Sequence, residues 1–181
     1  GFLLAIPGVK PGGESYLHSH MMGVKTGYRD MGLGRRMKLA QREEALNRGI
    51  RLVEWTFDPL ELKNAHFNIE RLGAVVKRYV LNQYGTTTSH LHGGLPTDRC
   101  VAEWRLESPR VSGLLAGTPE QRSEVLERIS IPNDIGEIRT NDPARAREIQ
   151  ARVSVGFLAA FNRGLTVTGF ERSAEAGTYT F

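Results

Sequence analysis

The stretch Arg29–Gly34 places the strongest constraint on how this chain can fold. It reads RDMGLG and joins an apolar, strand-like run, Tyr16–Val24, to a helix-like run, Leu33–Arg48. Glycine lets the backbone approach a ligand closely. The first amides of a helix have no intrahelical partner, and the helix dipole adds partial positive charge there. The stretch therefore predicts a strand, a tight turn and a helix whose N-terminus can bind an anionic group.

Known phosphate-binding turns differ in the residues that surround their glycines. A dinucleotide fingerprint would need a glycine three residues after Gly34, where the chain has methionine. A P-loop would need Gly-Lys-Ser/Thr where the chain has Gly34-Arg35-Arg36. Both patterns fail, and the pattern that remains is Arg-x-x-Gly-x-Gly, formed by Arg29, Gly32 and Gly34 after a strand.

The order of the predicted elements is typical of an α/β chain. Runs rich in branched and aromatic residues predict strands at Phe2–Ile6, Tyr16–Val24, Ile50–Phe57, Ala74–Leu81 and Cys100–Leu106. Helices are predicted at Leu33–Arg48, with Leu33, Met37 and Ala40 on one apolar face, and from Asp58-Pro59 to Leu72. We therefore expect an α/β (α+β) core over residues 1–108.

The remainder, residues 109–181, is expected to form a C-terminal α/β extension packed on the same domain. Residues 110–117 are expected to be irregular, residues 118–125 a short helix capped by Thr118, and residues 126–131 a strand. Asp142-Pro143 combines a capping residue with a proline and predicts the start of the longest helix, which would end near Asn162. Residues 165–170 and 177–181 predict a closing hairpin.

The bulk composition limits the classes of function. The chain has 181 residues, of which 40% are hydrophobic and 24% charged, as in a globular domain. The net charge of +4 is mild and the basic residues are interleaved with acids, so we expect no nucleic-acid partner. No apolar run approaches the roughly 20 residues of a membrane span, so we expect no membrane association. The single cysteine, Cys100, cannot form an internal disulfide and favours a cytoplasmic location.

The turn and its neighbours resemble the acetyl-CoA signature of the GNAT acyltransferase superfamily. In that family a strand is followed by (Gln/Arg)-x-x-Gly-x-(Gly/Ala) and a helix, which Arg29, Gly32 and Gly34 match. Tyr28 stands where an aromatic residue is common. The strand at 50–57, the next helix with Asn64 and its Leu-Gly ending look like the family's second conserved block. The resemblance covers residues 2 to about 106 and implies a GNAT-like mixed, splayed sheet flanked by helices.

The family fold normally begins with a strand and two helices before the first strand seen here. The chain starts with Gly1 and a strand-like run, so we expect it to be the later part of a longer polypeptide of a poorly characterised GNAT branch. Those front elements usually cover part of the acceptor site in the family.

The resemblance implies that the chain binds acetyl-CoA or another acyl-CoA. The backbone of Met22, Gly23 and Val24 would bond to the pantothenate arm as an added strand would. The pyrophosphate would lie against Arg29 and the amides of Asp30, Met31, Gly32, Leu33, Gly34 and Arg35. Asn64 would contact the pantetheine. The implied activity is transfer of an acetyl or succinyl-type group to a small amine or amino acid.

Acyl transfer to an amine needs a base, because alkyl ammonium groups have a pKa near that of lysine, about 10.4. We predict Glu54 and His20 as candidate bases on the two splayed strands. The family often carries a tyrosine as general acid four residues before the glycine that ends the second helix, and this chain has Ile69 there. Tyr84, together with Tyr79, is the nearest substitute, and we predict Tyr84 as the acid.

Three other readings of the same residues stay open. His18-Ser19-His20 and His90-Leu91-His92 have a spacing that could form a zinc site, but no cysteine flanks them and we predict no metal. Cys100 lies in a strand-like run, which is more typical of a buried residue than of a nucleophile. The alternative function is a non-catalytic acyl-CoA-binding or structural GNAT-fold protein, which Ile69 favours. Whether the chain forms a homodimer is also open.

Overall fold

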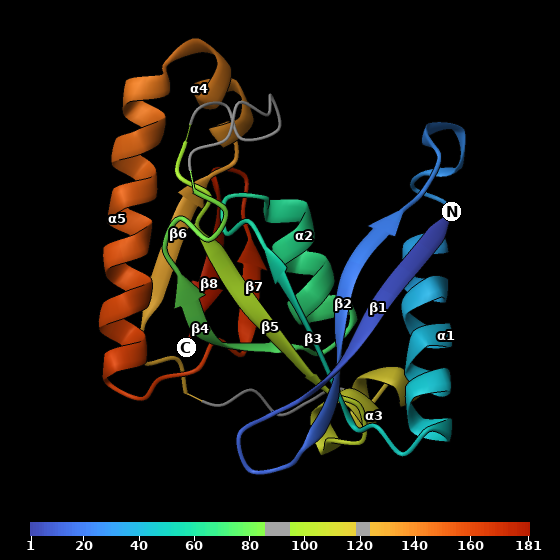
Figure 1. Cartoon of the computed structure of the whole chain (residues 1–181). Coiled ribbons are helices and arrows are strands. Elements are labelled where there is room, and N and C mark those ends of the chain that lie inside the picture. Colours follow the sequence, from blue (N-terminus) through green and yellow to red (C-terminus); the bar gives the residue numbers. More distant parts are fainter. Residues whose placement is uncertain (86–94, 119–123) are drawn as a thin grey trace. The chain divides into compact units, whose positions relative to one another are not determined.

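The computed structural model describes residues 1–85, 95–118 and 124–181, which form an α+β protein (Figure 1). A five-stranded mixed sheet has the order β1-β2-β3-β5-β4, and a three-stranded sheet has the order β6-β8-β7. The strands are β1 (Phe2–Val9), β2 (Ser15–Gly23), β3 (Leu52–Phe57), β4 (Val75–Val80), β5 (Arg99–Arg105), β6 (Arg128–Pro132), β7 (Gly169–Arg172) and β8 (Ala176–Thr180). The helices are α1 (Leu33–Asn47), α2 (Leu62–His66), α3 (Pro109–Ala116), α4 (Ile135–Asn141) and α5 (Pro143–Asn162). The mixed α and β fold class predicted from the sequence is confirmed.

The chain divides into two compact units that are discontinuous in sequence. The first contains Gly1–Trp55, Arg71–Ala74 and Glu103–Gln121, and the second contains Thr56–Glu70, Val75–Ala102 and Arg122–Phe181. The division at residue 108 expected from the sequence stays a prediction. No helix in the described ranges is both long enough and apolar enough to cross a membrane.

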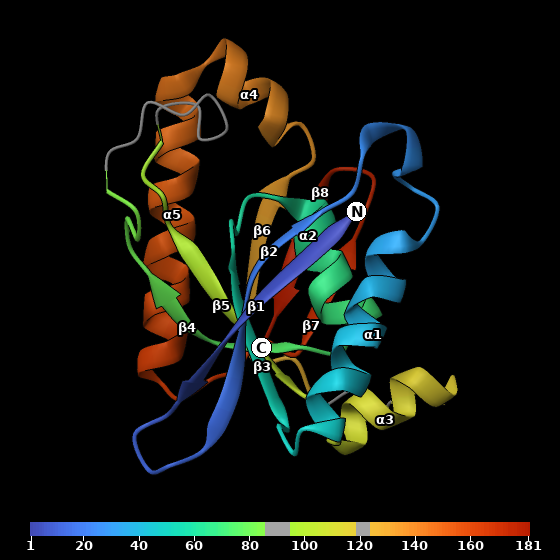
Figure 2. The same ribbon diagram turned by 45° about the vertical axis from the view of Figure 1, so that its right-hand side comes forward.

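The first unit is built on a β-hairpin and a strand–helix–strand crossover. Strands β1 and β2 pair antiparallel, and α1 connects β2 to the parallel strand β3. Helix α1 lies beside the β1–β2 hairpin in both views (Figures 1 and 2). Strand β1 continues through Pro7 to Val9, past the expected end at Ile6, because an edge strand tolerates a proline that donates no ladder hydrogen bond.

The buried face of α1 differs from the apolar face predicted from the sequence. The buried residues are Lys38, Gln41 and Ala45, whereas Ala40 is exposed. Two of the three buried residues are polar, so a search for apolar periodicity selects the neighbouring face instead. Burying a lysine and a glutamine costs free energy unless both make hydrogen bonds. This face of α1 is therefore a candidate for a functional site and not only for core packing.

The core of the second unit is an aromatic cluster centred on α5. Phe157 is fully buried, its ring stacks on Tyr79 with centroids 5.0 Å apart, and it meets Tyr179 edge-on at 5.0 Å. Phe161 and Phe181 extend the cluster. Figure 1 shows α5 running along β6. The long helix was predicted, and the structure confirms it. A closing hairpin is also present, but its first strand is Gly169–Arg172 and not residues 165–170 as predicted.

Two predictions about the helices were wrong. Residues 110–117 are not irregular but belong to α3, which Ser108 caps by accepting a hydrogen bond from the Val111 amide at 3.3 Å, with Pro109 in the first turn. Asp58 does not cap α2. Its Oδ1 accepts a hydrogen bond from the Leu60 amide at 2.8 Å and so forms a turn, and α2 begins only at Leu62.

Two further helices differ from the prediction or could not be compared with it. The short helix α4 was not predicted. Most of the helix expected at 118–125 falls on residues outside the described ranges.

The aspartates that precede α5 and α4 give a matched stability test. Asp142 caps α5 by accepting a hydrogen bond from the Arg145 amide at 3.0 Å, whereas Asp134 precedes α4 without a side-chain cap. We expect Asp142→Ala to lower the free energy of unfolding by about 1 kcal/mol and Asp134→Ala to have a much smaller effect. Urea denaturation of both variants measures this, and equal losses would contradict the assigned cap.

Candidate functional site

Strands β2 and β3 pair over a short distance and then separate. Their parallel pairing joins Tyr16 to Leu52, Leu17 to Val53 and His18 to Glu54, and among the described residues it ends there. Just beyond this point β2 contains a bulge, because Ala5 pairs with Ser19 while Leu4 pairs with Met21, which leaves His20 as the extra residue. A bulge bends a strand and strengthens its twist, which accounts for the separation.

The separation leaves the end of β2 with one edge unpaired. Residues Met21–Gly23 pair with β1 on one side and with no other strand in the described part of the chain. An extended ligand with amide groups can pair with such an edge as an added strand would. Met22 and Gly23, two of the residues predicted to contact an acyl-CoA arm, lie on this edge, and Val24 follows them.

The turn after β2 has a left-handed backbone at two positions. Asp30 has φ 60° and Gly32 has φ 73°. Arg29 does not extend freely into solvent, since its Nε donates a hydrogen bond to the Val24 carbonyl at 3.2 Å and ties the turn to the end of β2. Gly32 is the residue immediately before α1, and its left-handed φ is one that side-chain-bearing residues rarely adopt.

The N-terminus of α1 carries an unusual charge pattern. No side chain caps it, and its first turn contains no acidic residue. Arg35 and Arg36 lie in this first turn, where their positive charges oppose the helix dipole. An anion bound to the free amides of Leu33, Gly34 and Arg35 would remove this conflict. Met21, Met22, Tyr28 and Met31 are exposed around the turn and add apolar surface.

Glu54, the first candidate base, is buried and ion-paired. Its side chain is 4% exposed, and Lys10 Nζ lies 2.6 Å from its Oε1. Lys10 comes from the tip of the β1–β2 hairpin and also lies over the Tyr16 ring. If Glu54 accepts a proton, its ion pair with Lys10 must therefore weaken or break.

His20, the second candidate base, is exposed on the bulge, and its ring centroid lies 5.8 Å from that of His18. His18 was not selected from the sequence, yet it is the residue that pairs directly with Glu54 across the strands. Burial lowers the pKa of His18 below 6.5, the nearby His20 and Lys38 lower it further, and Glu54 acts against them. A histidine that stays neutral at pH 7 can accept a proton, so His18 joins the candidate bases.

Removing His20 should change the titration of His18. We expect His20→Asn to raise the pKa of His18 towards 6.5, because the variant removes a like charge. The pKa is lower in the folded state than in the unfolded state, so the unfolded state binds the proton first. Stability is therefore lost as the pH falls through about 6.5. Titration of the imidazole protons by nuclear magnetic resonance measures the shift, and an unchanged pKa in His20→Asn would contradict the assigned coupling.

Lys38 is the functional candidate that the sequence pattern missed. It is 3% exposed, its Nζ donates to Ser19 Oγ at 2.8 Å and to Gln41 Oε1 at 3.2 Å, and it lies 3.7 Å from the centroid of the Trp55 ring. Burial lowers the pKa of Lys38 from 10.5 to about 7. Lys38 lies on the face of α1 that is turned to the sheet, at a position where an apolar residue is expected. Its spacing from Gln41 and Ala45 is the only sequence signal that could have indicated its burial.

Three residues discussed from the sequence lie in the second unit. Tyr84 is exposed, its hydroxyl lies 3.2 Å from Thr56 Oγ1, and Arg99 lies over its ring. Asn64 is exposed on α2. Ile69 is fully buried in the π-helical turn that follows α2, so this position is part of the core. The proposed roles of Tyr84 and Asn64 stay predictions.

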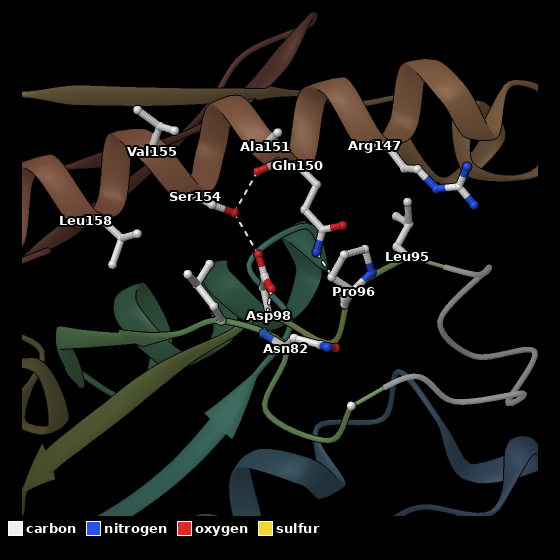
Figure 3. Close-up of a pocket in the computed structure, with 12 residues that line it drawn as sticks. Asn82, Leu95, Pro96, Asp98, Arg147, Gln150, Ala151, Ser154, Val155 and Leu158 are labelled. Carbon is white, nitrogen blue, oxygen red and sulfur yellow. Dashed lines mark hydrogen bonds between the residues drawn. The ribbon is translucent and has the colours of Figure 1, made fainter.

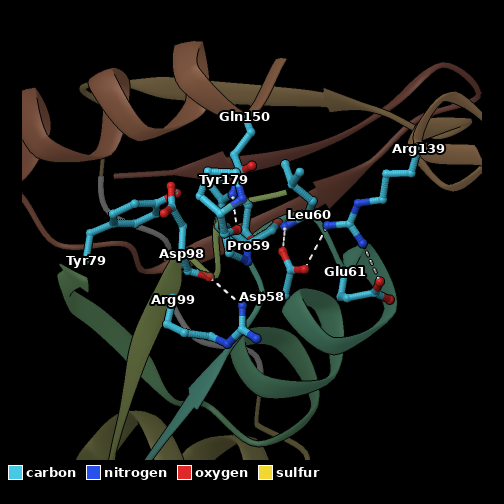
Figure 4. A network of polar contacts seen from close by, with 11 residues as sticks. Asp58, Pro59, Leu60, Glu61, Tyr79, Asp98, Arg99, Arg139, Gln150 and Tyr179 are labelled. Atoms are coloured by element: carbon cyan, nitrogen blue, oxygen red, sulfur yellow. Dashed lines mark hydrogen bonds and ion pairs between the residues drawn. The ribbon is translucent and has the colours of Figure 1, made fainter. Parts of the chain in front are cut away.

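A polar network stabilises the second unit around β5 (Figure 4). Asp98 is buried and accepts hydrogen bonds from Ser154 at 2.7 Å and Tyr79 at 3.2 Å, and Arg99 donates to the Asp98 carbonyl at 2.7 Å. Burial and the charges of Asp58 and Asp98 raise the pKa of the Cys100 thiol. A buried thiol with a raised pKa does not supply a thiolate nucleophile.

The second unit also contains a cavity of about 730 Å³ beside α5 (Figure 3). Its walls include the apolar side chains of Leu81, Val155 and Leu158, together with the polar side chain of Asp98. Gln150 donates to the Pro96 carbonyl at 2.7 Å, and its Oε1 has no hydrogen-bond partner among the described residues. None of the site residues predicted from the sequence lines this cavity.

No group of His, Cys, Asp and Glu residues within the described ranges could hold a metal ion. His90 and His92, which formed half of the metal hypothesis, fall outside those ranges. No protein-family model matches this sequence, and no curated protein matches it significantly.

Proposed function

We propose that the chain is a CoA-dependent N-acyltransferase of the GNAT type. It would move an acetyl or succinyl-type group from an acyl-CoA to a small amine or amino acid. The observation that carries the proposal is the separation of β2 from β3 at the bulge of His20, directly before a left-handed turn and an uncapped helix N-terminus. An anionic head group and an extended amide arm each have a complementary surface there.

The fit of an acyl-CoA rests on features of the first unit. The amides at the start of α1, with Arg35 and Arg36 beside them, suit a pyrophosphate. The unpaired edge of β2 from Met21 to Gly23 suits the amides of the arm. An arm held at its phosphate end by the turn and paired along β2 would run back towards Ser19 and His20, so the acyl group would come to the bulge. We also propose a cytoplasmic location, supported by the single, buried Cys100.

The acceptor amine must lose a proton before or during attack, and the candidate bases lie at the point where the strands separate. Glu54 and His18 are paired across β2 and β3, and His20 lies on the bulge between them and the turn. Glu54 is the base we favour, with Lys10 holding its carboxylate in place. Backbone amides of the bulged strand are suitable donors for the oxyanion of the intermediate.

Replacing Glu54 by glutamine tests this assignment. An amide cannot accept the proton, so we expect Glu54→Gln to lower kcat by roughly 100-fold to 10,000-fold while the affinity for the acyl donor changes little. Release of free CoA thiol with a panel of small amines measures kcat. Glu14→Gln is the matched control, because it breaks an exposed ion pair with Arg105 in the same unit. Equal activity in Glu54→Gln and the control would remove Glu54 from the mechanism.

The second candidate is an acyl-CoA-binding protein without catalysis. Two observations favour it. Glu54 is ion-paired with Lys10, and Ile69 occupies the position at which the resemblance implies a tyrosine. Saturable binding of acetyl-CoA with no thiol release across the amine panel would support this candidate over the acyltransferase.

A further inference from the structure

Lys38 lies at the apex of the separation between β2 and β3. Its Nζ donates to Ser19, the first residue of β2 after the last pair with β3. It also lies over the ring of Trp55, the first residue of β3 after the same pair. Ser19 directly precedes the bulged residue His20. The ammonium group is therefore positioned where the strands separate.

The cluster around Lys38 has more hydrogen-bond donors than acceptors. An ammonium group has three N–H donors, and Lys38 donates to Ser19 Oγ and Gln41 Oε1. Gln41 is 7% exposed, and its Nε2 has no hydrogen-bond partner among the described residues. An unsatisfied buried donor costs roughly 1–3 kcal/mol, so a ligand that brings an acceptor or a negative charge to this apex would be favoured.

We propose that Lys38 is the proton donor to the leaving sulfur of the acyl donor, an inference that rests on the proposed acyltransferase function. The acceptor nitrogen forms a bond to the acyl carbon, the carbon–sulfur bond breaks, and its electron pair goes to the sulfur. Lys38 Nζ transfers a proton to that sulfur and becomes a neutral amine. The proton that the acceptor nitrogen has lost then passes through the bases or water and protonates Lys38 again.

The acidity of Lys38 suits this role. Burial brings its pKa to about 7, below the value of about 8.5 for an ordinary thiol, so transfer to a thiolate is downhill. An ordinary lysine, with a pKa near 10.4, would transfer the proton uphill. The charged and titratable groups on β2, β3 and α1, the elements around Lys38, are Tyr16, His18, His20, Glu54, Arg35, Arg36, Arg42, Glu43 and Glu44. Lys38 would replace the tyrosine that the resemblance implies at Ile69, which is buried in the core of the second unit.

The first test measures the thiol of CoA itself and needs no turnover. CoA is bound to the full chain, and the thiolate is followed by ultraviolet absorbance as the pH is raised, with S-methyl-CoA as the blank. We expect the bound thiol of the parent to titrate at a lower pH than in Lys38→Met, because the fraction of Lys38 that still holds its proton stabilises the thiolate. In Lys38→Met the bound thiol should titrate at or above the value of free CoA.

The outcomes separate the two proposals. If CoA does not bind the parent, the proposed function fails and this inference fails with it. If CoA binds but its thiol titrates identically in the parent and in Lys38→Met, the inference alone is overturned. Lys77→Met removes an exposed lysine of β4 and should behave like the parent. Thermal unfolding of each variant checks that it is folded.

The second test uses the pH profile of turnover. We expect kcat of the parent to fall as the pH rises above about 7, because Lys38 then loses the proton that it donates. Lys38→Met and Lys38→Arg should each lower kcat by roughly 100-fold to 10,000-fold and lose this alkaline decline. Retention of the decline in Lys38→Met would assign it to another group and overturn the inference.

Discussion

Replacing Lys38 by methionine is expected to abolish a rise in stability that the parent shows between pH 7 and pH 10. Lys38 has a pKa of about 7 in the folded protein and an ordinary value of 10.5. Between these values the unfolded chain holds a proton that the folded chain has lost. Linkage then makes the free energy of unfolding increase with pH. The folding equilibrium constant rises by up to about tenfold per pH unit.

The expected difference is large. Over three pH units it reaches up to about 4 kcal/mol between the parent and Lys38→Met. Denaturation by urea at pH 7, 8, 9 and 10 measures it. Lys77→Met, which removes an exposed lysine, should follow the parent. Parallel curves for the parent and Lys38→Met would show that Lys38 titrates alike in both states, and the burial argument for its role would be wrong.

Replacing Phe157 by alanine is expected to be the most destabilising single truncation in the second unit. Phe157 is fully buried and contacts Tyr79, Phe161, Tyr179 and Phe181. Removing a buried phenylalanine ring leaves a cavity and costs about 3–5 kcal/mol. The stacked ring of Tyr79 also carries the hydroxyl that donates to Asp98, so loss of the stack loosens a buried hydrogen bond.

A second aromatic residue on the same helix provides the control. Phe161 lies one turn further along α5 and is only partly buried, so Phe161→Ala should cost less than half as much. Urea denaturation compares the two variants. Equal losses, or a loss below about 1 kcal/mol for Phe157→Ala, would contradict the placement of Phe157 at the centre of this core.

The sequence predicted the elements that have local signals. Asp142-Pro143 and Gly164 mark the two ends of α5, and the structure confirms the helix between them. The glycines of Arg29–Gly34 predicted a tight turn, and the backbone there is left-handed at Asp30 and Gly32. In α3, Ser108-Pro109 is the same kind of signal, and the expectation of irregular backbone at residues 110–117 was wrong.

The apex of the candidate site could not be predicted in the same way. Lys38 and Gln41 occupy positions that a periodicity argument reserves for apolar residues, so the pattern pointed to Leu33, Met37 and Ala40. The bulge at His20 depends on how β1 and β2 pair, which no local run of residues encodes. Sites with a function are where such local rules are expected to fail.

The central claim is that the turn after β2 binds the anionic head group of an acyl-CoA, and calorimetric titration of the full chain with acetyl-CoA tests it most directly. Gly32 has φ 73°, so a side chain there strains the turn by about 1–2 kcal/mol. Gly27 lies in open space with an ordinary φ and supplies the matched control. We predict saturable binding to the parent and to Gly27→Val, and binding at least about tenfold weaker to Gly32→Val. Absence of saturable binding to the parent, or unchanged affinity in Gly32→Val, would contradict the claim.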